Sequence, residues 1–379
     1  MSESTRHFET LTIHGERMAG THSSGDPVVY PKEGSTIFRM GEDENVGPIY
    51  TRHDNPNRQQ LETMLALLEG GEACAAFASG MAASSAILQS LRPGDHLLIP
   101  LDLYHGVRTL ARDLLKPWNL AVDAVDMTDP VKVKKAIRPE TKMVWMETPS
   151  NPLLQITDIE AITSICRERG ILTVVDNTWP SPILQRPIEL GTDLVLHSTS
   201  KYIGGHSDLL GGAVIARSAE GLFESIRKNQ SVSGAVPSPD DCWLMLRSIR
   251  TLPWRMRGHD EHAMQVARYL AGHPAVSGVF YPGLEDHPGY KIARRQMDGF
   301  GGMLSFLVKG DRAATKRVFL GSKLIIPATS LGGVESLWEH RIRSEGPKSE
   351  TPENLIRLSV GLEHPDDLIQ DISQALKRV

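Results

Sequence analysis

The chain has 379 residues, of which 40% are hydrophobic and 23% charged, and its formal net charge is -5. This length favours two domains, and a weakly acidic chain offers no electrostatic reason to bind nucleic acid or an anionic membrane. No apolar run approaches transmembrane length and the first residues lack an apolar core, so we expect a cytoplasmic protein that acts on a small molecule.

The three cysteines, Cys74, Cys166 and Cys242, are widely spaced and form neither a CxxC pair nor a metal-ligand pattern. Each lies in an apolar stretch. We therefore expect buried, reduced thiols and no metal ion.

The N-terminal part, residues 1–46, is polar and turn-rich and shows no sustained periodicity, which predicts an arm ordered by packing against something else. In the loop that follows, residues 47–57, Tyr50 and Arg52 stand two positions apart, so an extended chain would present them on one face. Apolar residues then recur at helical spacing over 56–69, and a glycine pair ends this helix.

Short apolar runs separated by helical patterns follow, which predicts an α/β fold with a large, mostly parallel sheet covered on both sides. We place this large domain at residues 47–238. The predicted strands lie at 73–77, 96–100, 121–125, 142–147, 171–176, 193–198 and 212–216.

Between the first strand and the next helix lies the tight turn of residues 78–81. Free backbone N–H groups point outward at a helix N-terminus, so Gly80 and Met81 could hold a phosphate. The alternative is that these small residues only allow close packing of the helix on the strand.

We assign residues 239–379 to a smaller α+β domain. A helical stretch over 239–271 bridges into it, and Pro253 should break or kink that stretch. Strands are predicted near 276–281, 302–308 and 355–360, followed by a closing helix. Residues 327–350 show no clear period and predict a loop of the kind that often belongs to a site.

Two predicted strands end in residues that suit one cofactor. Asp176 directly follows an apolar run, where an ionised carboxylate needs a cation, and Lys201 follows another strand, where its amine could form a Schiff base. Aspartate for the ring nitrogen and lysine for the aldehyde is the pairing that pyridoxal phosphate requires. Taken alone, Lys201 could equally be an exposed lysine in a glycine-rich turn.

The chain resembles the Cys/Met-metabolism family of pyridoxal-phosphate enzymes from about residue 12 to residue 376. This family contains cystathionine γ-synthases, cystathionine γ- and β-lyases and methionine γ-lyases. The motifs that carry the resemblance are Tyr50-Thr51-Arg52 with Asn55-Pro56, Ser79-Gly80-Met81-Ala82, Pro149-Ser150-Asn151-Pro152, Asp176-Asn177-Thr178, Ser198-Thr199-Ser200-Lys201-Tyr202, Ser330-Leu331-Gly332-Gly333 and Leu355-Ile356-Arg357-Leu358-Ser359.

The resemblance implies a type I pyridoxal-phosphate transferase fold, with pyridoxal 5'-phosphate bound to Lys201 and a tyrosine, Tyr104, stacked on its ring. The other roles that it implies are ring-nitrogen partner for Asp176, phosphate contacts for Gly80, Met81, Ser198 and Ser200, and substrate contacts for Arg357, Asn151, Ser330 and Thr329. Tyr50 and Arg52 would reach the phosphate of a neighbouring subunit, which makes the active site shared. We expect a homotetramer built as a dimer of dimers.

Several positions depart from the family pattern. Ser200 stands where threonine is common, and His105 begins a run that replaces two glycines and a threonine after Tyr104. Thr329 stands where enzymes acting on cystathionine often carry glutamate, and Leu331 where β-lyases often have tryptophan. Residues 338–346 do not match the usual segment, and their charged side chains could recognise a different polar substrate.

The resemblance leads us to expect a lyase for γ-elimination on an L-amino acid, with Lys201 as the base. Other activities that we consider are γ-replacement, as in cystathionine γ-synthase, and β-elimination, as in cystathionine β-lyase. A further variant is γ-elimination with a non-thiol leaving group, such as that of canavanine. A catalytically silent scaffold is the alternative outside enzyme chemistry, and it predicts a colourless protein.

Overall fold

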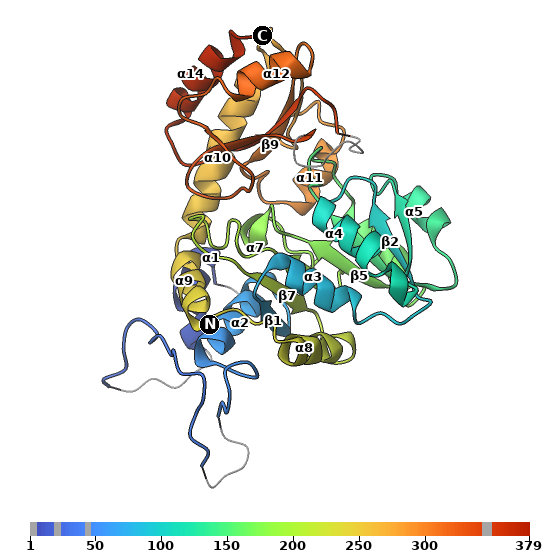
Figure 1. Cartoon of the computed structure of the whole chain (residues 1–379), viewed down its shortest axis with the longest axis vertical. Helices are drawn as coiled ribbons and strands as arrows, with labels where there is room; N and C mark the ends of the chain where they lie inside the picture. Colours follow the sequence, from blue (N-terminus) through green and yellow to red (C-terminus); the bar gives the residue numbers. More distant parts are fainter. Residues whose placement is uncertain (1–5, 19–23, 42–46, 343–350) are drawn as a thin grey trace.

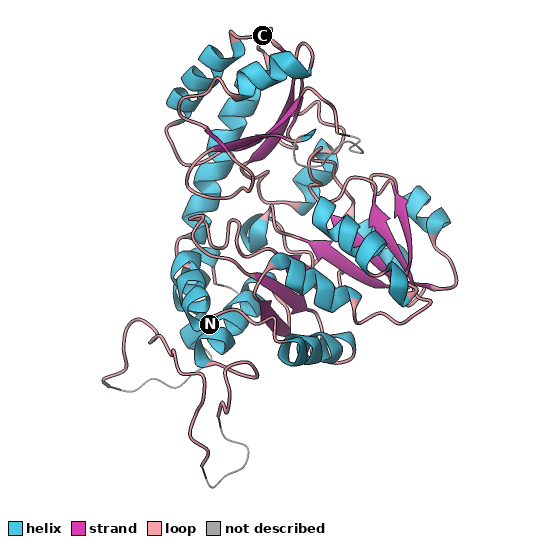
Figure 2. Cartoon of the chain, viewed as in Figure 1, coloured by secondary structure: helices cyan, strands magenta, loops and turns pink. Residues whose placement is uncertain are grey.

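The computed structural model of the chain describes residues 6–18, 24–41, 47–342 and 351–379. It contains two sheets with their covering helices (Figures 1 and 2). The first sheet follows the order β1-β7-β6-β5-β4-β2-β3 and the second the order β10-β11-β12-β9-β8. The α/β class and the mostly parallel large sheet are thus confirmed.

In the larger sheet β7 pairs antiparallel with both β1 and β6, while the other neighbouring strands are parallel. Most of its residues are buried, as expected for a sheet covered on both faces. Its strands are β1 (Ala73–Phe77), β2 (His96–Pro100), β3 (Ala121–Val125), β4 (Thr141–Glu147), β5 (Leu172–Asp176), β6 (Leu194–His197) and β7 (Gly212–Ala216).

Capping residues mark the ends of helices around this sheet. Asn55 caps α2 by accepting from the amide of Asn57, and Gly70 ends that helix with a φ of 74°. Ser79 caps α3 in the same way. The helices of this part are α2 (Pro56–Glu69), α3 (Gly80–Leu88), α4 (His105–Thr109), α5 (Pro130–Ala136), α6 (Ile159–Arg167), α7 (Ser181–Leu184) and α8 (Leu222–Ser233).

The helical stretch predicted over 239–271 is two helices, α9 (Pro239–Ile249) and α10 (Leu252–Ala271), with Pro253 in the first turn of the second. A proline there loses no helical hydrogen bond, which explains the break. Helices α11 (Tyr290–Gln296), α12 (Arg312–Phe319) and α14 (Pro365–Leu376) complete this part, together with β8 (Val276–Phe280), β9 (Met303–Val308), β10 (Ile326–Pro327), β11 (Leu337–His340) and β12 (Leu355–Ser359).

Two regions contain secondary structure that the local sequence pattern did not predict. The N-terminal arm contains a helix, α1 (Phe8–Met18), which contacts α2 and α10 and is therefore held by tertiary packing. The predicted loop of residues 327–350 contains β11, which pairs antiparallel with β12. The domain boundaries at residues 46 and 238 stay a proposal.

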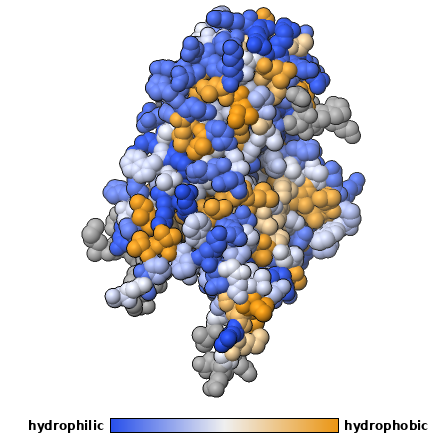
Figure 3. Space-filling model, turned by 60° about the vertical axis from the view of Figure 1, so that its left-hand side comes forward, coloured by the Kyte–Doolittle hydropathy of each residue, from blue (hydrophilic) through white to orange (hydrophobic). Residues whose placement is uncertain are grey.

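Residues 24–41 of the arm extend away from the body at the lower end of the molecule (Figure 1). They expose apolar side chains, among them Val28 at 76%, Ile37 at 69% and Met40 at 76%. Hydrophobic surface on the lobe that projects there is visible in Figure 3. Such surface on an extended segment is typical of a contact with another chain.

The parallel strands β4, β5 and β6 end side by side in Glu147, Asp176 and His197, since Glu147 is the register partner of Asp176 and Asp176 that of Leu196. Polar groups therefore gather at one edge of the large sheet. Open α/β sheets bind their ligands at such an edge.

Candidate active site

A cavity of about 280 Å³ opens at this edge, and residues from the second part of the chain close it. Every predicted site residue except Tyr50 and Arg52 lines it. Those that do are Gly80, Met81, Tyr104, Asn151, Asp176, Ser198, Ser200, Lys201, Thr329, Ser330 and Arg357.

Lys201 lies in the turn after β6, and its Nζ donates a hydrogen bond of 2.9 Å to the hydroxyl oxygen of Ser330. Burial lowers the pKa of this amine, the positive charge of Arg357 lowers it further, and Glu339 opposes both effects. A lysine with a lowered pKa is a better nucleophile and a better base near neutral pH.

Ser330 has a φ of 95°, in the left-handed region that side chains rarely adopt. Its hydroxyl meets Lys201 while its carbonyl accepts from Nη2 of Arg357 at 3.2 Å. Backbone strain of this kind concentrates at functional sites because surrounding contacts must hold it.

Arg357, on β12, is 4% exposed and donates to Oδ1 of Asn151 at 3.0 Å. Its Nη2 also lies 2.8 Å from Oε2 of Glu339, and Nη1 of Arg341 lies 3.1 Å from the same oxygen. Because Arg341 and Arg357 share the carboxylate of Glu339, its single negative charge compensates only part of the positive charge of Arg357. The arrangement suits a carboxylate ligand.

Glu339 and Arg341 belong to the segment 338–346 that departs from the family pattern. Residues Trp338 to Arg341 are buried, and Arg341 lines the cavity. The rest of that segment from residue 343 lies outside the described residues. The sequence marked this segment as unusual but could not show which of its charges turns inward.

Asp176 ends β5 and faces the cavity. Its Oδ1 accepts from the amide and the hydroxyl of Thr178 at 3.0 and 2.5 Å, and no described residue donates to Oδ2. Burial raises the pKa of this carboxyl, while the bonds from Thr178 and the charge of His197 lower it. A half-buried acid with one oxygen turned to the cavity is what a protonated ring nitrogen would pair with.

Glu147, at the end of β4, is a buried acid that the sequence reasoning did not select. Its Oε2 accepts from the amide of Tyr104 at 3.0 Å. Burial and the nearby Asp176 raise its pKa well above the usual range, which favours the neutral form of this acid. The signal was present: like Asp176, it directly follows an apolar run.

The turn before α3 has the form of an anion site. The hydroxyl of Ser79 accepts from the amide of Ala82, and the amides of the first α3 residues remain available. Gly80 is required here, since a Cβ would lie 2.9 Å from Cβ of Ser198. The hydroxyl of Ser200 is already bonded to the backbone of Gly211, which places Ser198 better than Ser200 for a phosphate.

Tyr104 precedes α4, is 41% exposed and lines the cavity. Gly106 makes room for its ring, because a Cβ there would lie 2.6 Å from Cε1 of Tyr104 and 2.9 Å from Sδ of Met81. His105, which begins the run that departs from the family pattern, is exposed and bonds with Thr109 at 3.4 Å, and it is not part of the cavity wall.

Tyr50 and Arg52 do not reach the cavity of their own chain. Tyr50 is 42% exposed, and Nη1 of Arg52 donates to the carbonyl of Ser231 at 2.7 Å. The guanidinium also lies 5.6 Å from the ring centroid of Tyr50. Their predicted contact with a neighbouring subunit stays a prediction.

The donor set fits pyridoxal phosphate. Asp176 would meet the need of the ring nitrogen, the Gly80 turn that of the phosphate, and the Lys201 amine that of the aldehyde, and all three line one cavity. Fold and site together define an enzyme that uses pyridoxal phosphate.

Comparison with known proteins agrees with this class. Residues 9–377 match the family of Cys/Met metabolism PLP-dependent enzymes, so the chain belongs to this family and its cofactor is pyridoxal 5'-phosphate. A cystathionine gamma-synthase of Mycobacterium tuberculosis is 47% identical over 86% of both chains. A cystathionine gamma-lyase of Bacillus subtilis is 41% identical over 98% of this chain and 99% of its own length.

The crystal structure of metB from Corynebacterium glutamicum superposes with a TM-score of 0.95 and 40% identity, and covers 100% of this chain and 99% of the other. The fold is therefore that of this family. In the described part of the chain, no helix is long and apolar enough to cross a membrane.

Proposed function

We propose that the protein is a lyase that catalyses γ-elimination on an L-amino acid with a γ leaving group. The observation that carries the proposal is the Lys201 amine, held at 2.9 Å by Ser330 and shifted by burial toward its neutral form. γ-Elimination removes a proton at Cα and then one at Cβ. One amine on a flexible stem can reach both carbons in turn.

Pyridoxal phosphate, when bound, supplies an electron sink for the bond electrons released at Cα. Arg357 then orients the substrate by binding its α-carboxylate, with Asn151 beside it. Lys201 takes the protons. Tyr104 lies on the same cavity, and its hydroxyl is the donor that we assign to the departing γ group.

The choice among substrates rests on Thr329. It lines the cavity next to Ser330 and offers a hydroxyl instead of a carboxylate. A distal ammonium group such as that of cystathionine would find no anion at this position. This favours substrates whose γ substituent carries no positive charge, such as methionine or an O-acylhomoserine.

The reaction is tested by product analysis in heavy water. The purified holoenzyme is incubated separately with L-methionine, O-acetyl-L-homoserine, L-cystathionine and L-canavanine, and products are identified by mass spectrometry. We expect 2-oxobutanoate with deuterium at the former Cβ. Pyruvate from cystathionine, with no reaction of the other three, would identify β-elimination and overturn the proposal.

Adding a nucleophile to the reaction distinguishes γ-replacement from γ-elimination. With O-acetyl-L-homoserine and an excess of L-cysteine, we expect 2-oxobutanoate to remain the main product. If cystathionine forms in its place, the enzyme is a γ-replacement enzyme.

We further propose a homo-oligomer, a dimer of dimers, in which Tyr50 and Arg52 complete the phosphate site of the neighbouring subunit. Two observations support it. Both residues lie outside their own cavity, and the arm before them exposes apolar side chains such as Ile37 and Met40. The mass of the holoenzyme in solution, measured by light scattering, tests the assembly.

A further inference from the structure

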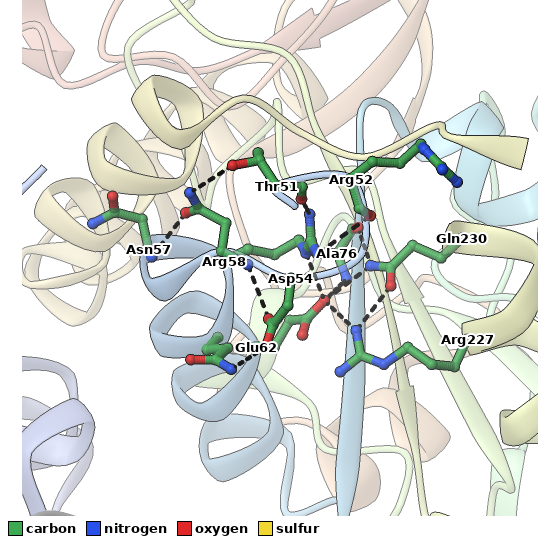
Figure 4. A network of polar contacts seen from close by, with 11 residues as sticks. Thr51, Arg52, Asp54, Asn57, Arg58, Glu62, Ala76, Arg227 and Gln230 are labelled. Atoms are coloured by element: carbon green, nitrogen blue, oxygen red, sulfur yellow. Dashed lines mark hydrogen bonds and ion pairs between the residues drawn. The ribbon is translucent and has the colours of Figure 1, made fainter. Parts of the chain in front are cut away.

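The loop that carries Tyr50 and Arg52 is fixed from below by a buried arginine, Arg58, on α2. This side chain is 1% exposed. Its Nη1 donates to the carbonyl of Thr51 at 2.8 Å and its Nη2 to that of Arg52 at 3.5 Å. Figure 4 shows the guanidinium beneath the loop, while the Arg52 side chain points away from it.

Arg58 is itself held by the buried Glu62, whose Oε1 lies 3.9 Å from its Nε. That one oxygen also accepts from Arg227 at 2.7 Å and from Gln230 at 2.9 Å (Figure 4). Buried charges are placed this accurately only when hydrogen bonds and counter-charges fix them. The orientation of the loop is thus set by a rigid network.

The same carboxylate oxygen of Glu62 accepts from the amide of Ala76 in β1 at 2.8 Å. Strand β1 leads directly into the turn of Gly80. Glu62 therefore supports two elements. One is β1, which leads to the phosphate turn of its own cavity, and the other, through Arg58, is the loop that faces away from that cavity.

We propose that Arg58 is a positioning residue that acts in trans: it orients Arg52 for the active site of a second copy of this chain and has no role in its own. This rests on the shared site of the proposed function. Glu62 is the contrasting case, because it supports a site element in each of the two copies.

Subunit mixing tests the proposal. We expect the Lys201→Ala and the Arg58→Met homo-oligomers each to be inactive or weakly active. The two variants are refolded together in equal amounts. In a quarter of the sites, by random pairing, an intact Lys201 meets an intact loop from the other chain. We therefore expect about a quarter of the wild-type activity to return.

Cofactor retention gives a second readout. The Arg58→Met homo-oligomer should bind pyridoxal phosphate at least about tenfold more weakly, measured by absorbance titration of the cofactor-free protein. Arg52→Ala mixed with Lys201→Ala is the positive control. Glu62→Ala mixed with Lys201→Ala should recover at least about threefold less activity than Arg58→Met does, because its own β1 is affected.

No recovery with Arg58→Met, while Arg52→Ala recovers, would show that Arg58 acts within its own site and would overturn the inference. No recovery in either mixture would overturn the shared site as well, and the heavy-water products would still report on γ-elimination. If Arg58→Met does not fold, Arg58→Lys, which keeps the charge and loses the paired donors, replaces it with the same expected outcomes.

Discussion

The amine of Lys201 and the hydroxyl of Ser330 lie 2.9 Å apart although 129 positions separate them in the chain. The lysine follows a strand of the large sheet, and the serine belongs to the segment before β11. The active site therefore forms only when the two sheets dock. Replacements on either side of this contact should affect catalysis more than folding.

For Ser330→Ala we expect kcat to fall about tenfold, because Lys201 loses the bond that aims it, a loss of about 1–2 kcal/mol. The melting temperature should change by no more than a few degrees. Steady-state kinetics and thermal unfolding measure both. Unchanged kcat would show that the bond does not position the amine.

For Lys201 itself, replacement by alanine should lower turnover by at least about a thousandfold. In the wild type, reduction with borohydride should remove the yellow colour. The peptide that contains Lys201 should then be heavier by the mass of the reduced, covalently attached cofactor. A colourless preparation that takes up no added cofactor would instead support the silent scaffold.

The lowered pKa of Lys201 predicts a pH dependence in the cofactor-free protein. A lowered pKa means that the amine loses its proton at lower pH, so its acylation rate should rise at lower pH than that of Nα-acetyl-lysine added as a reference. In Arg357→Met the rise should move to higher pH, because a positive charge has been removed. Peptide mass spectrometry after timed labelling measures these midpoints.

The sequence predicted residues that do line the cavity where they end a strand or lie in the turn after it. An apolar run that ends in a polar residue marks Asp176, Lys201 lies in the turn after β6, and parallel strands bring such ends together. The same rule would have found Glu147. By contrast, α1 and β11 depend on partners remote in sequence, α2 and β12, so local periodicity could not reveal them.

Replacement by the corresponding neutral amide side chain should have opposite effects on activity at the neighbouring acids Asp176 and Glu147. Burial and Asp176 raise the pKa of Glu147 well above its usual range, so we expect the neutral Glu147→Gln to keep activity within about threefold. Asp176→Asn removes the charge that the ring nitrogen needs, and kcat should fall by about a hundredfold or more. The kinetics of both variants are measured at one pH, with cofactor saturation verified by absorbance. If Glu147→Gln were the more damaging change, the roles assigned to the two acids would be reversed.

Arg341 should act on substrate binding through Glu339. In Arg341→Gln the carboxylate of Glu339 loses its 3.1 Å contact with Arg341 and compensates more of the charge of Arg357. We expect KM to rise about tenfold with kcat nearly unchanged, since the α-carboxylate is bound in both ground and transition states. Arg341→Lys, which keeps the charge, is the matched control. A fall in kcat at constant KM would contradict this role.

Gly106 tests the placement of Tyr104. A Cβ at this position would lie 2.6 Å from the Tyr104 ring and 2.9 Å from Sδ of Met81, so Gly106→Ala must displace the ring. We expect kcat to fall at least about tenfold for the same cofactor occupancy, because a shifted hydroxyl no longer meets the γ leaving group. Gly272→Ala is the control, since its Cβ would meet only carbonyl oxygens at 3.9 Å. If both variants retain full activity, Tyr104 is not the proton donor, and the leaving group must take its proton from elsewhere.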